Sequence, residues 1–176
     1  RGFIITGTSS GIGHELCKIL LENPDNKVFG LGRTQNIEHT NYHHLALDLN
    51  NIKEIENIEF PSWSNAEQIS LIHNAGWIGP IQKIGNQELG AIASAYIINL
   101  VAPAVLSSQF ISMYKSSKAQ KVILSMSSGA ANTAIEGWST YCSSKAGLDM
   151  LSKCIDEEYQ DIINLSVAPG LSLIHI

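Results

Sequence analysis

The sequence predicts an α/β fold, in which a parallel sheet lies between two layers of helices (three-layer αβα). Two patterns predict this class. Short β-branched runs alternate along the chain with longer segments whose apolar residues recur every three or four positions. A glycine-rich turn also joins the first strand to the first helix, which is typical of doubly wound sheets.

Length and composition bound the possibilities. The 176 residues fit one domain, at roughly 150 residues per domain. Eleven basic and sixteen acidic residues give a net charge of −5, which argues against a nucleic-acid groove or a polybasic membrane surface. Charged residues make up only 15%, against a usual value of about 25%, so the surface is expected to be either unusually neutral or partly covered by another protein segment or subunit.

The cysteines and the apolar runs indicate the compartment. Cys17, Cys142 and Cys154 are an odd number without CxxC spacing, which favours a reducing, cytoplasmic environment over a disulfide framework. We find no apolar run near 18 residues and no signal peptide, so neither a membrane span nor membrane binding is expected.

We expect six strands, at residues 3–6, 27–32, 43–47, 69–72, 121–126 and 163–167. The first expected helix begins near Gly11. Three more are expected, over residues 52–58, 87–114 and 140–159. Pro24 ends the first helix. Only about ten residues separate the second and third strands, which is short for a crossover helix, so a loop or a single turn is expected there.

The glycine turn reads Thr-Gly-Thr-Ser-Ser-Gly-Ile-Gly over residues 6–13. Gly7 suits a positive φ, Gly11 allows close approach of a ligand to the backbone, and Gly13 allows the helix to pack on the sheet. With Ser9, Ser10 and Ile12, they place the N–H groups of a helix start where a phosphate binds. The turn predicts a dinucleotide site of the Rossmann type; a glycine turn without a ligand is the alternative.

The ends of the second and third strands indicate which dinucleotide. A carboxylate after the second strand would favour NAD, but the residue there is Arg33. A guanidinium can pair with a 2′-phosphate, which favours NADP(H); a solvated surface arginine is the alternative. Asp48 ends the third strand, where it can contact the adenine amino group or cap the next helix.

Tyr141 and Lys145 lie four residues apart, on one face of the last expected helix. A phenol titrates near 10, and we expect the neighbouring ammonium to lower that pKa, making Tyr141 a general acid for a carbonyl. Ser128, 13 residues earlier, follows the fifth strand, and its hydroxyl can hydrogen-bond a substrate carbonyl. A surface Tyr–Lys pair and ordinary turn chemistry at Ser128 are the alternatives.

From Thr6 to Gly170 the chain resembles the short-chain dehydrogenase/reductase family. The resemblance rests on the glycine turn, His-Asn-Ala-Gly at 73–76 in place of the family's Asn-Asn-Ala-Gly, Asn99, Ser128, the YxxxK pair and Pro169-Gly170. Residues 137–147 and 99–103 are most similar to the sepiapterin reductase and benzil reductase branch.

The resemblance implies roles at the reacting end. Tyr141 would donate the proton, Lys145 would hold the nicotinamide ribose and tune Tyr141, Ser128 would orient the carbonyl, and Asn99 would hold a relay water. For the cofactor, the resemblance implies that Asn74, Ala75 and Gly76 border its adenosine end. It also implies that Pro169 and Gly170 pass near its nicotinamide.

Two departures from the family pattern stand out. His73 replaces an asparagine, and we interpret it as a buried, satisfied histidine rather than an acid or base. After Gly170 the family continues with a substrate loop, helices and a seventh strand, whereas residues 171–176 do not match it. We therefore expect a cofactor-binding domain over 1–170, a foreign or misread tail, a truncated chain and a sheet without its last strand.

Other clusters carry weaker hypotheses. His39, His43 and His44 lack Cys or acidic partners at ligand spacing, so no metal is expected. Trp138 either lines a substrate pocket or anchors a loop. In the resembling family the helices near 87–114 and 140–159 pair across a subunit interface, so a homodimer or tetramer is expected.

The leading hypothesis is an oxidoreductase that uses NADPH to reduce a ketone or diketone, a small-molecule carbonyl substrate. A non-catalytic NADP-binding module or redox sensor is one alternative, and a ketoacyl or sugar reductase of the same family is another.

Overall fold

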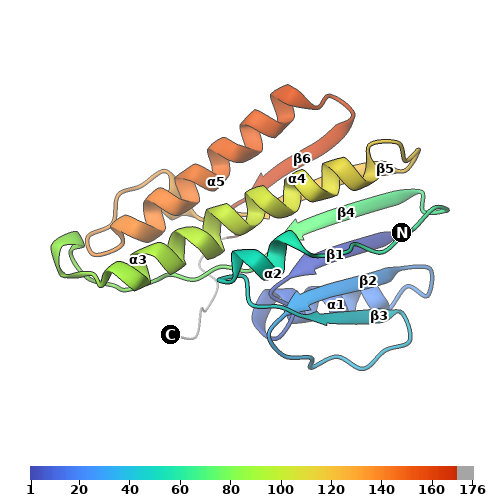
Figure 1. The fold of residues 1–176 in the computed structure, drawn as a ribbon, viewed down its shortest axis with the longest axis horizontal. Coiled ribbons are helices and arrows are strands. Elements are labelled where there is room, and N and C mark those ends of the chain that lie inside the picture. Colours follow the sequence, from blue (N-terminus) through green and yellow to red (C-terminus); the bar gives the residue numbers. More distant parts are fainter. Residues whose placement is uncertain (170–176) are drawn as a thin grey trace.

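The computed structural model describes residues 1–169, so Gly170 and the expected tail at 171–176 lie outside the described residues. Six parallel strands form one sheet in the order β3-β2-β1-β4-β5-β6 (Figure 1). Every expected strand is confirmed with its ends within one residue. The bounds are β1 Gly2–Thr6, β2 Lys27–Gly32, β3 Tyr42–Ala46, β4 Gln68–His73, β5 Gln120–Met126 and β6 Ile162–Val167.

Helices cover both faces of the sheet, as predicted for a three-layer fold (Figure 1). Helix α1 (Gly11–Leu21) lies on one face. The other face carries α2 (Ile52–Glu56), α3 (Leu89–Tyr96), the π-helical turn η2 (Ile97–Val101), α4 (Ala102–Tyr114) and α5 (Ser139–Glu158). Short 3₁₀ turns η1 (Ile84–Asn86) and η3 (Gly129–Ala131) precede α3 and α5. As expected, residues 33–41 contain no helix.

The core has two parts because alternate residues of each strand face opposite sides of the sheet. Ile4 packs with Leu106 and Phe110 of α4, whereas its neighbours Phe3 and Ile5 pack on the α1 side. The central strands β1, β2 and β4 are buried on both faces and read as nearly continuous apolar runs, which is why the sequence located them closely.

The site is placed by the strand order. The chain runs outward from β1 through β2 to β3, and then crosses back to build β4, β5 and β6 on the other side. The carboxyl ends of β1 and β4 therefore border the crevice in which open α/β sheets bind ligands. The glycine turn follows β1 and the His-Asn-Ala-Gly segment begins at the end of β4, so both reach this edge.

One stretch differs from the expectation about apolar runs. The continuous helix from Leu89 to Tyr114 is long and apolar enough to cross a membrane by length and composition, with a mean hydropathy of 1.9. The sequence scan missed it because uncharged polar residues interrupt the apolar ones. A helix packed against a protein core passes the same test, and Leu106 and Phe110 of this helix are fully buried in the core.

Candidate active site and cofactor site

The glycine turn has the backbone geometry that its sequence predicts. Gly7 and Gly11 adopt positive φ angles of 73° and 60°. A Cβ on Gly13 would overlap the carbonyl oxygen of Gly7, so only glycine fits where α1 packs on the turn. A Cβ on Gly11 would meet nothing within 4 Å, so the backbone there is open to an approaching group.

The start of α1 keeps its donors available. Its N-cap residue, Ser10, makes no side-chain cap hydrogen bond, and no acidic residue lies in the first turn. The first backbone N–H groups of a helix have no partner within the helix, and they carry the positive end of its dipole. An open glycine backbone followed by uncapped N–H groups fits the pyrophosphate of a dinucleotide.

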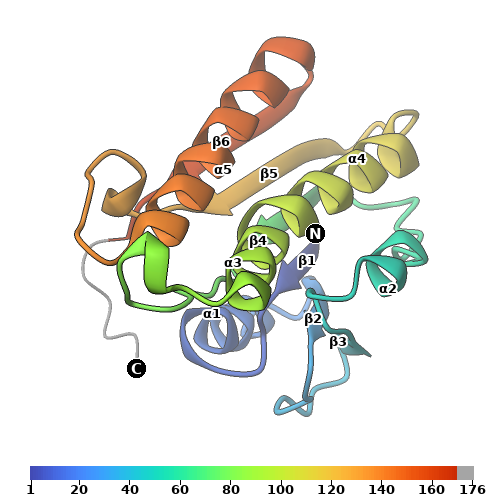
Figure 2. The ribbon, with the colours of Figure 1, turned by 60° about the vertical axis from the view of Figure 1, so that its left-hand side comes forward.

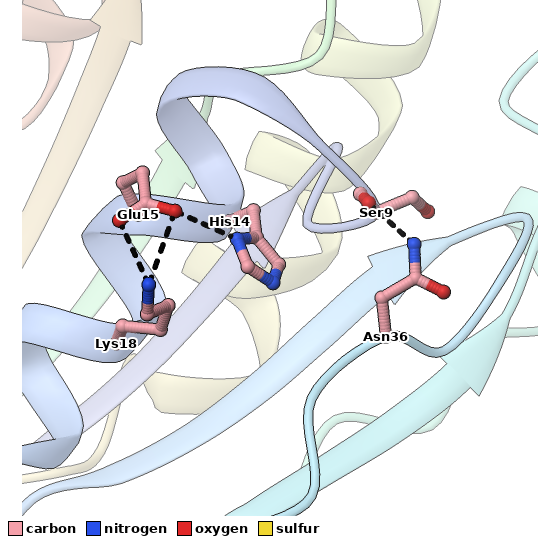
Figure 3. A network of polar contacts seen from close by, with 5 residues as sticks. All are labelled: Ser9, His14, Glu15, Lys18 and Asn36. Atoms are coloured by element: carbon pink, nitrogen blue, oxygen red, sulfur yellow. Dashed lines mark hydrogen bonds and ion pairs between the residues drawn. The ribbon is translucent and has the colours of Figure 1, made fainter.

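Side chains tie this turn to β3 and to the loop after β2. The hydroxyls of Thr8 and Tyr42 lie 2.9 Å apart, and Ser9 Oγ donates to the carbonyl of Thr34 at 2.8 Å. The side-chain amide of Asn36 donates to the carbonyl of Ser9 at 2.6 Å (Figure 3). One turn further along α1, His14 and Lys18 both contact the exposed carboxylate of Glu15 (Figure 3). The sequence analysis missed Tyr42 and Asn36, which no local spacing connects to the turn.

The Asn-Ala-Gly segment joins the glycine turn to β4. The amide of Asn74 donates to the carbonyls of Thr6 and Gly7 at 3.0 and 3.1 Å. The backbone N–H of Ala75 donates to Thr6 Oγ1 at 3.0 Å. Asn74 therefore shapes the turn through the protein's own backbone. Gly76 follows, where a Cβ would lie 3.3 Å from Lys145 Nζ.

The two residues predicted to contact the adenosine end of the dinucleotide, Arg33 and Asp48, are both exposed. Arg33 follows β2 directly, and among residues 1–169 no hydrogen bond or ion pair holds its guanidinium. Asp48 accepts a hydrogen bond from the N–H of Asn50 at 2.9 Å, which makes a tight turn. The N-cap of α2 is Asn51, so the alternative that Asp48 caps this helix is wrong.

Tyr141 lies on the first turn of α5 and is buried, with its ring edge-on to Trp138 at a centroid distance of 5.7 Å. Burial raises the pKa of the phenol, and a hydrogen bond with Ser128 lowers it by less. Trp138 therefore packs on Tyr141, the predicted proton donor.

The position of Lys145 corrects one expectation. Its ammonium donates to the carbonyl of Met126 at 2.7 Å and lies 5.9 Å from the centroid of the Tyr141 ring. Burial lowers the pKa of Lys145 to about 8, opposed by the carboxylate of Asp149. The prediction that the Tyr141 pKa lies below its ordinary value is wrong in this structure, because burial of the phenol outweighs the nearby polar groups.

Ser128 fits both interpretations of its sequence position. Its Oγ accepts the N–H of Ala130 at 3.2 Å, which is the turn chemistry considered as the alternative. The same hydroxyl is close enough to Tyr141 to lower the pKa of its phenol. The sheet end thus brings together Ser128, Tyr141 and Lys145, as predicted.

Asn99 is fully buried, and its amide is engaged on both sides. Its Nδ2 donates to the carbonyl of Trp77 at 2.7 Å and to Ser144 Oγ at 3.0 Å, while its Oδ1 accepts the N–H of Trp77 at 2.8 Å. Asn99 therefore fastens the loop after β4 to α5, the helix that carries Tyr141.

The backbone at Asn99 is π-helical, a feature the sequence analysis did not predict. Such turns within α-helices recur at functional sites. Pro103, four residues later, has no N–H to donate to the carbonyl of Asn99, so the regular helical bond cannot form at this position. A proline inside an apolar helix pattern was the available signal.

His73 is buried, as the sequence analysis expected, but it is only half satisfied, because within residues 1–169 its Nδ1 has no hydrogen-bond partner. It is 2% exposed, and its Nε2 lies 2.8 Å from Ser107 Oγ. Burial, together with the charge of Lys145, lowers its pKa to about 3, so the ring is neutral at physiological pH. It is not poised as an acid or base for the reaction.

The three histidines considered as metal ligands have separate partners. His39 Nδ1 accepts the N–H of Asn41 at 3.1 Å, His43 stacks on Phe29, and His44 Nδ1 lies 3.1 Å from the Tyr42 hydroxyl. Across residues 1–169 no group of three or more His, Cys, Asp or Glu side chains is arranged to hold a metal ion.

Comparison with known proteins places this site in a family. The family model for short chain dehydrogenase matches residues 2–173. The chain belongs to the short-chain dehydrogenase family. The benzil reductase ((S)-benzoin forming) of Bacillus subtilis is 35% identical over 96% of this chain and 73% of that protein.

Solved structures agree with this assignment. KRED1-Pglu is 29% identical and superposes with a TM-score of 0.86, covering 98% of this chain and 75% of its own. The 4-hydroxyisoleucine dehydrogenase complexed with NADH is 26% identical, with a TM-score of 0.85 over 97% of this chain and 73% of its own. The protein is an oxidoreductase of this family, whose members bind nicotinamide cofactors.

Proposed function

We propose that this short-chain dehydrogenase uses NADPH to reduce a ketone or diketone carbonyl to an alcohol. The observation that carries the proposal is the meeting of Tyr141, Lys145 and Ser128 at the end of β5. The similarity to a benzil reductase supports the substrate class, because benzil is a diketone.

Two hydroxyls act on the carbonyl oxygen in this proposal. When bound, NADPH supplies the hydride that is added to the carbonyl carbon. Ser128 donates a hydrogen bond to the carbonyl oxygen, and Tyr141 transfers its proton to that oxygen as the C=O π electrons move onto it. The raised pKa of the buried phenol keeps this proton in place at neutral pH.

Lys145 and Asn99 support the reacting groups. Lys145 would hold the nicotinamide ribose, since its ammonium is buried beside Tyr141 and Gly76. Asn99 would hold a relay water near Lys145. Its side-chain amide is already bonded to Trp77 and Ser144, so this role would fall to its backbone carbonyl, which Pro103 leaves without the regular helical donor.

The remaining predicted residues would hold the dinucleotide. The turn from Gly7 to Gly13 and the start of α1 would bind the pyrophosphate, and Asn74 to Gly76 would border the adenosine end. Arg33 would pair with the 2′-phosphate and Asp48 with the adenine amino group. Pro169, and Gly170 beyond the described residues, would pass near the nicotinamide.

The apolar surroundings of Tyr141 suit a substrate with hydrocarbon substituents. Ile81 and Ile135 are 46% and 40% exposed, and Trp138 packs on the phenol. Ile81 also lies against Gly137, which directly precedes Trp138, so these side chains come from two loops that meet at the start of α5. Apolar groups flanking the carbonyl would bury this surface on binding.

The test offers the chain a panel of diketones and pterins and follows the consumption of NADPH by its absorbance. The Tyr141→Phe variant is the control. We expect turnover of at least one diketone and its loss in the variant. Turnover that survives Tyr141→Phe unchanged, or no turnover on any member of the panel, contradicts the proposal.

We also propose that the chain assembles as a homodimer or tetramer through α3–α4 and α5, in a reducing cytoplasmic compartment. Apolar side chains on these helices are exposed, with Leu89 at 83%, Met113 at 49% and Met150 at 57%. Cys17, Cys142 and Cys154 are free thiols. Light scattering on the Met150→Glu variant tests the assembly: a smaller particle than wild type is expected, and an unchanged monomeric mass for both contradicts it.

A further inference from the structure

Gln87 is a buried polar residue outside the family motifs, and it makes hydrogen bonds in two directions. It is 8% exposed and directly precedes Glu88, the N-cap residue of α3. Its Nε2 donates to the carbonyl of Gln82 at 2.8 Å and to Ser139 Oγ at 3.3 Å. Its Oε1 accepts the hydroxyl of Thr140, which is 2% exposed.

These bonds join two loops that are far apart in the sequence. The N–H of Gln82 also donates to the carbonyl of Gly137 at 3.0 Å, so a backbone bond runs beside the side-chain ones. Figures 1 and 2 both show the start of α3 beside the start of α5. Gln87 therefore fastens the segment after β4 to the first turn of the helix that carries Tyr141.

The Gln87 side chain bonds two residues in the first turn of α5, Ser139 and Thr140. Trp138, its N-cap residue, makes no side-chain cap hydrogen bond, and the first turn contains no acidic residue. Such a helix start lacks the local contacts that usually hold it. Thr140 lies within this turn and is bonded to Gln87, and Tyr141 is the next residue.

We propose that Gln87 is a positioning residue for the reduction, acting through Thr140 to fix the first turn of α5 and so the Tyr141 hydroxyl relative to Ser128. This inference rests on the proposed function for its kinetic consequences, but the placement of Tyr141 is a structural property that can be measured without turnover. Removing the Gln87 amide leaves the buried Thr140 hydroxyl and the Gln82 carbonyl without their partner.

Three variants separate positioning from general stability. Gln87→Leu and Thr140→Val each delete the bond between the two side chains, whereas Thr140→Ser keeps the hydroxyl. Gln109→Leu is the matched control, because Gln109 also joins two segments: its Nε2 donates to the carbonyls of Ile55 and Glu56 at 3.0 and 3.1 Å. That contact links α4 to α2, on the part of the helical layer that does not contain α5.

The kinetic test measures kcat and the KM for NADPH in each variant, at a saturating concentration of the carbonyl substrate. We expect Gln87→Leu and Thr140→Val to lower kcat by roughly ten- to a hundredfold with KM for NADPH unchanged, since small misplacements of reacting groups cost about that much. The double variant should be no slower than the slower single variant, because both act through one bond. Thr140→Ser and Gln109→Leu should keep kcat within about twofold.

The structural test uses chains with ¹³Cζ-labelled tyrosine, with the Tyr141 signal assigned by its absence in Tyr141→Phe. We expect Gln87→Leu and Thr140→Val to move that signal, and Thr140→Ser and Gln109→Leu to leave it. An unmoved Tyr141 signal in Gln87→Leu, or an equal shift in Gln109→Leu, overturns the inference even for a chain that turns over no carbonyl. A wild-type chain without turnover whose Tyr141 signal still moves as expected supports the placement and contradicts only the proposed function.

Discussion

The ammonium of Lys145 lies 5.9 Å from the centre of the Tyr141 ring, yet it donates its hydrogen bond to the carbonyl of Met126 at 2.7 Å. The backbone at the last residue of β5 therefore fixes Lys145, and the phenol is its neighbour. Burial shifts the two pKa values in opposite directions, because it disfavours the phenolate and the ammonium alike. At neutral pH the phenol is protonated. The ammonium of Lys145 stays charged, and burying this charge costs folding free energy.

This cost predicts the effect of Lys145→Met on stability. The pKa of Lys145 is about 8 in the folded chain, against 10.5 for an ordinary lysine, so its penalty is complete below about pH 8 and disappears as the pH rises to 10.5. We expect the variant to raise the free energy of unfolding at pH 7 by up to about 3 kcal/mol, while carbonyl reduction is lost. Urea unfolding at pH 7 and pH 10 measures this, and a gain that is equal at both pH values contradicts the assignment.

His73 predicts a contribution to stability in acid. Its pKa is about 3 when folded, against 6.5 for an ordinary histidine, so the unfolded chain binds the extra proton between these values. The contribution is complete above pH 6.5 and is lost as the pH falls toward 3. His73→Gln keeps a polar atom toward Ser107 but does not titrate, so its unfolding free energy should fall less steeply, by up to about 1.4 kcal/mol per pH unit. Parallel pH curves for the two chains would show that His73 does not titrate as described.

The sequence predicted the sheet closely, since the central strands β1, β2 and β4 are buried on both faces and are apolar runs between turn residues. It also placed the glycine turn, Ser128, Tyr141 and Lys145 at one edge, because the carboxyl ends of parallel strands meet there. These features depend on local order along the chain, which a sequence displays directly.

The unpredicted features depend on contacts between distant segments. Asn99 bonds the backbone of Trp77 22 positions earlier, and Gln87 bonds Thr140 53 positions later, so no spacing rule connects them. The direction of the Tyr141 pKa was also wrong from sequence, because Lys145 four residues away is visible in the sequence whereas the burial of the phenol is not. Only the π-helical turn had a local signal, in Pro103.

The geometry of the glycine turn predicts that alanine lowers mainly stability at Gly13 and mainly NADPH binding at Gly11. A Cβ at Gly13 would overlap the oxygen of Gly7 and the Asn74 amide, so Gly13→Ala should lower stability by at least about 1–3 kcal/mol, on the order of an overpacked core. At Gly11 a Cβ meets no protein atom, but φ is +60°, so Gly11→Ala should cost only about 1–2 kcal/mol while weakening NADPH binding strongly. Thermal unfolding and calorimetric titration separate the two effects.

Gly85→Ala is the control for both variants, since a Cβ there meets nothing within 4 Å and φ is not positive. It should change neither stability nor NADPH affinity appreciably. A Gly11→Ala chain that binds NADPH as tightly as Gly85→Ala would contradict the placement of the pyrophosphate at this turn.

Arg33 carries the prediction on nucleotide choice. It follows β2 with an exposed guanidinium, and a carboxylate at this strand end would instead accept hydrogen bonds from the hydroxyls of the adenosine ribose. Arg33→Asp should weaken NADPH binding by roughly ten- to a hundredfold, as expected for losing a charged hydrogen bond of about 1.5–3 kcal/mol, and should leave NADH binding equal or tighter. Lys118→Asp makes the same charge change before β5, at the opposite edge of the sheet, and controls for long-range electrostatics. Calorimetric Kd values for both nucleotides decide the matter: a ratio unchanged in Arg33→Asp, or changed equally in Lys118→Asp, would remove Arg33 from the proposed site.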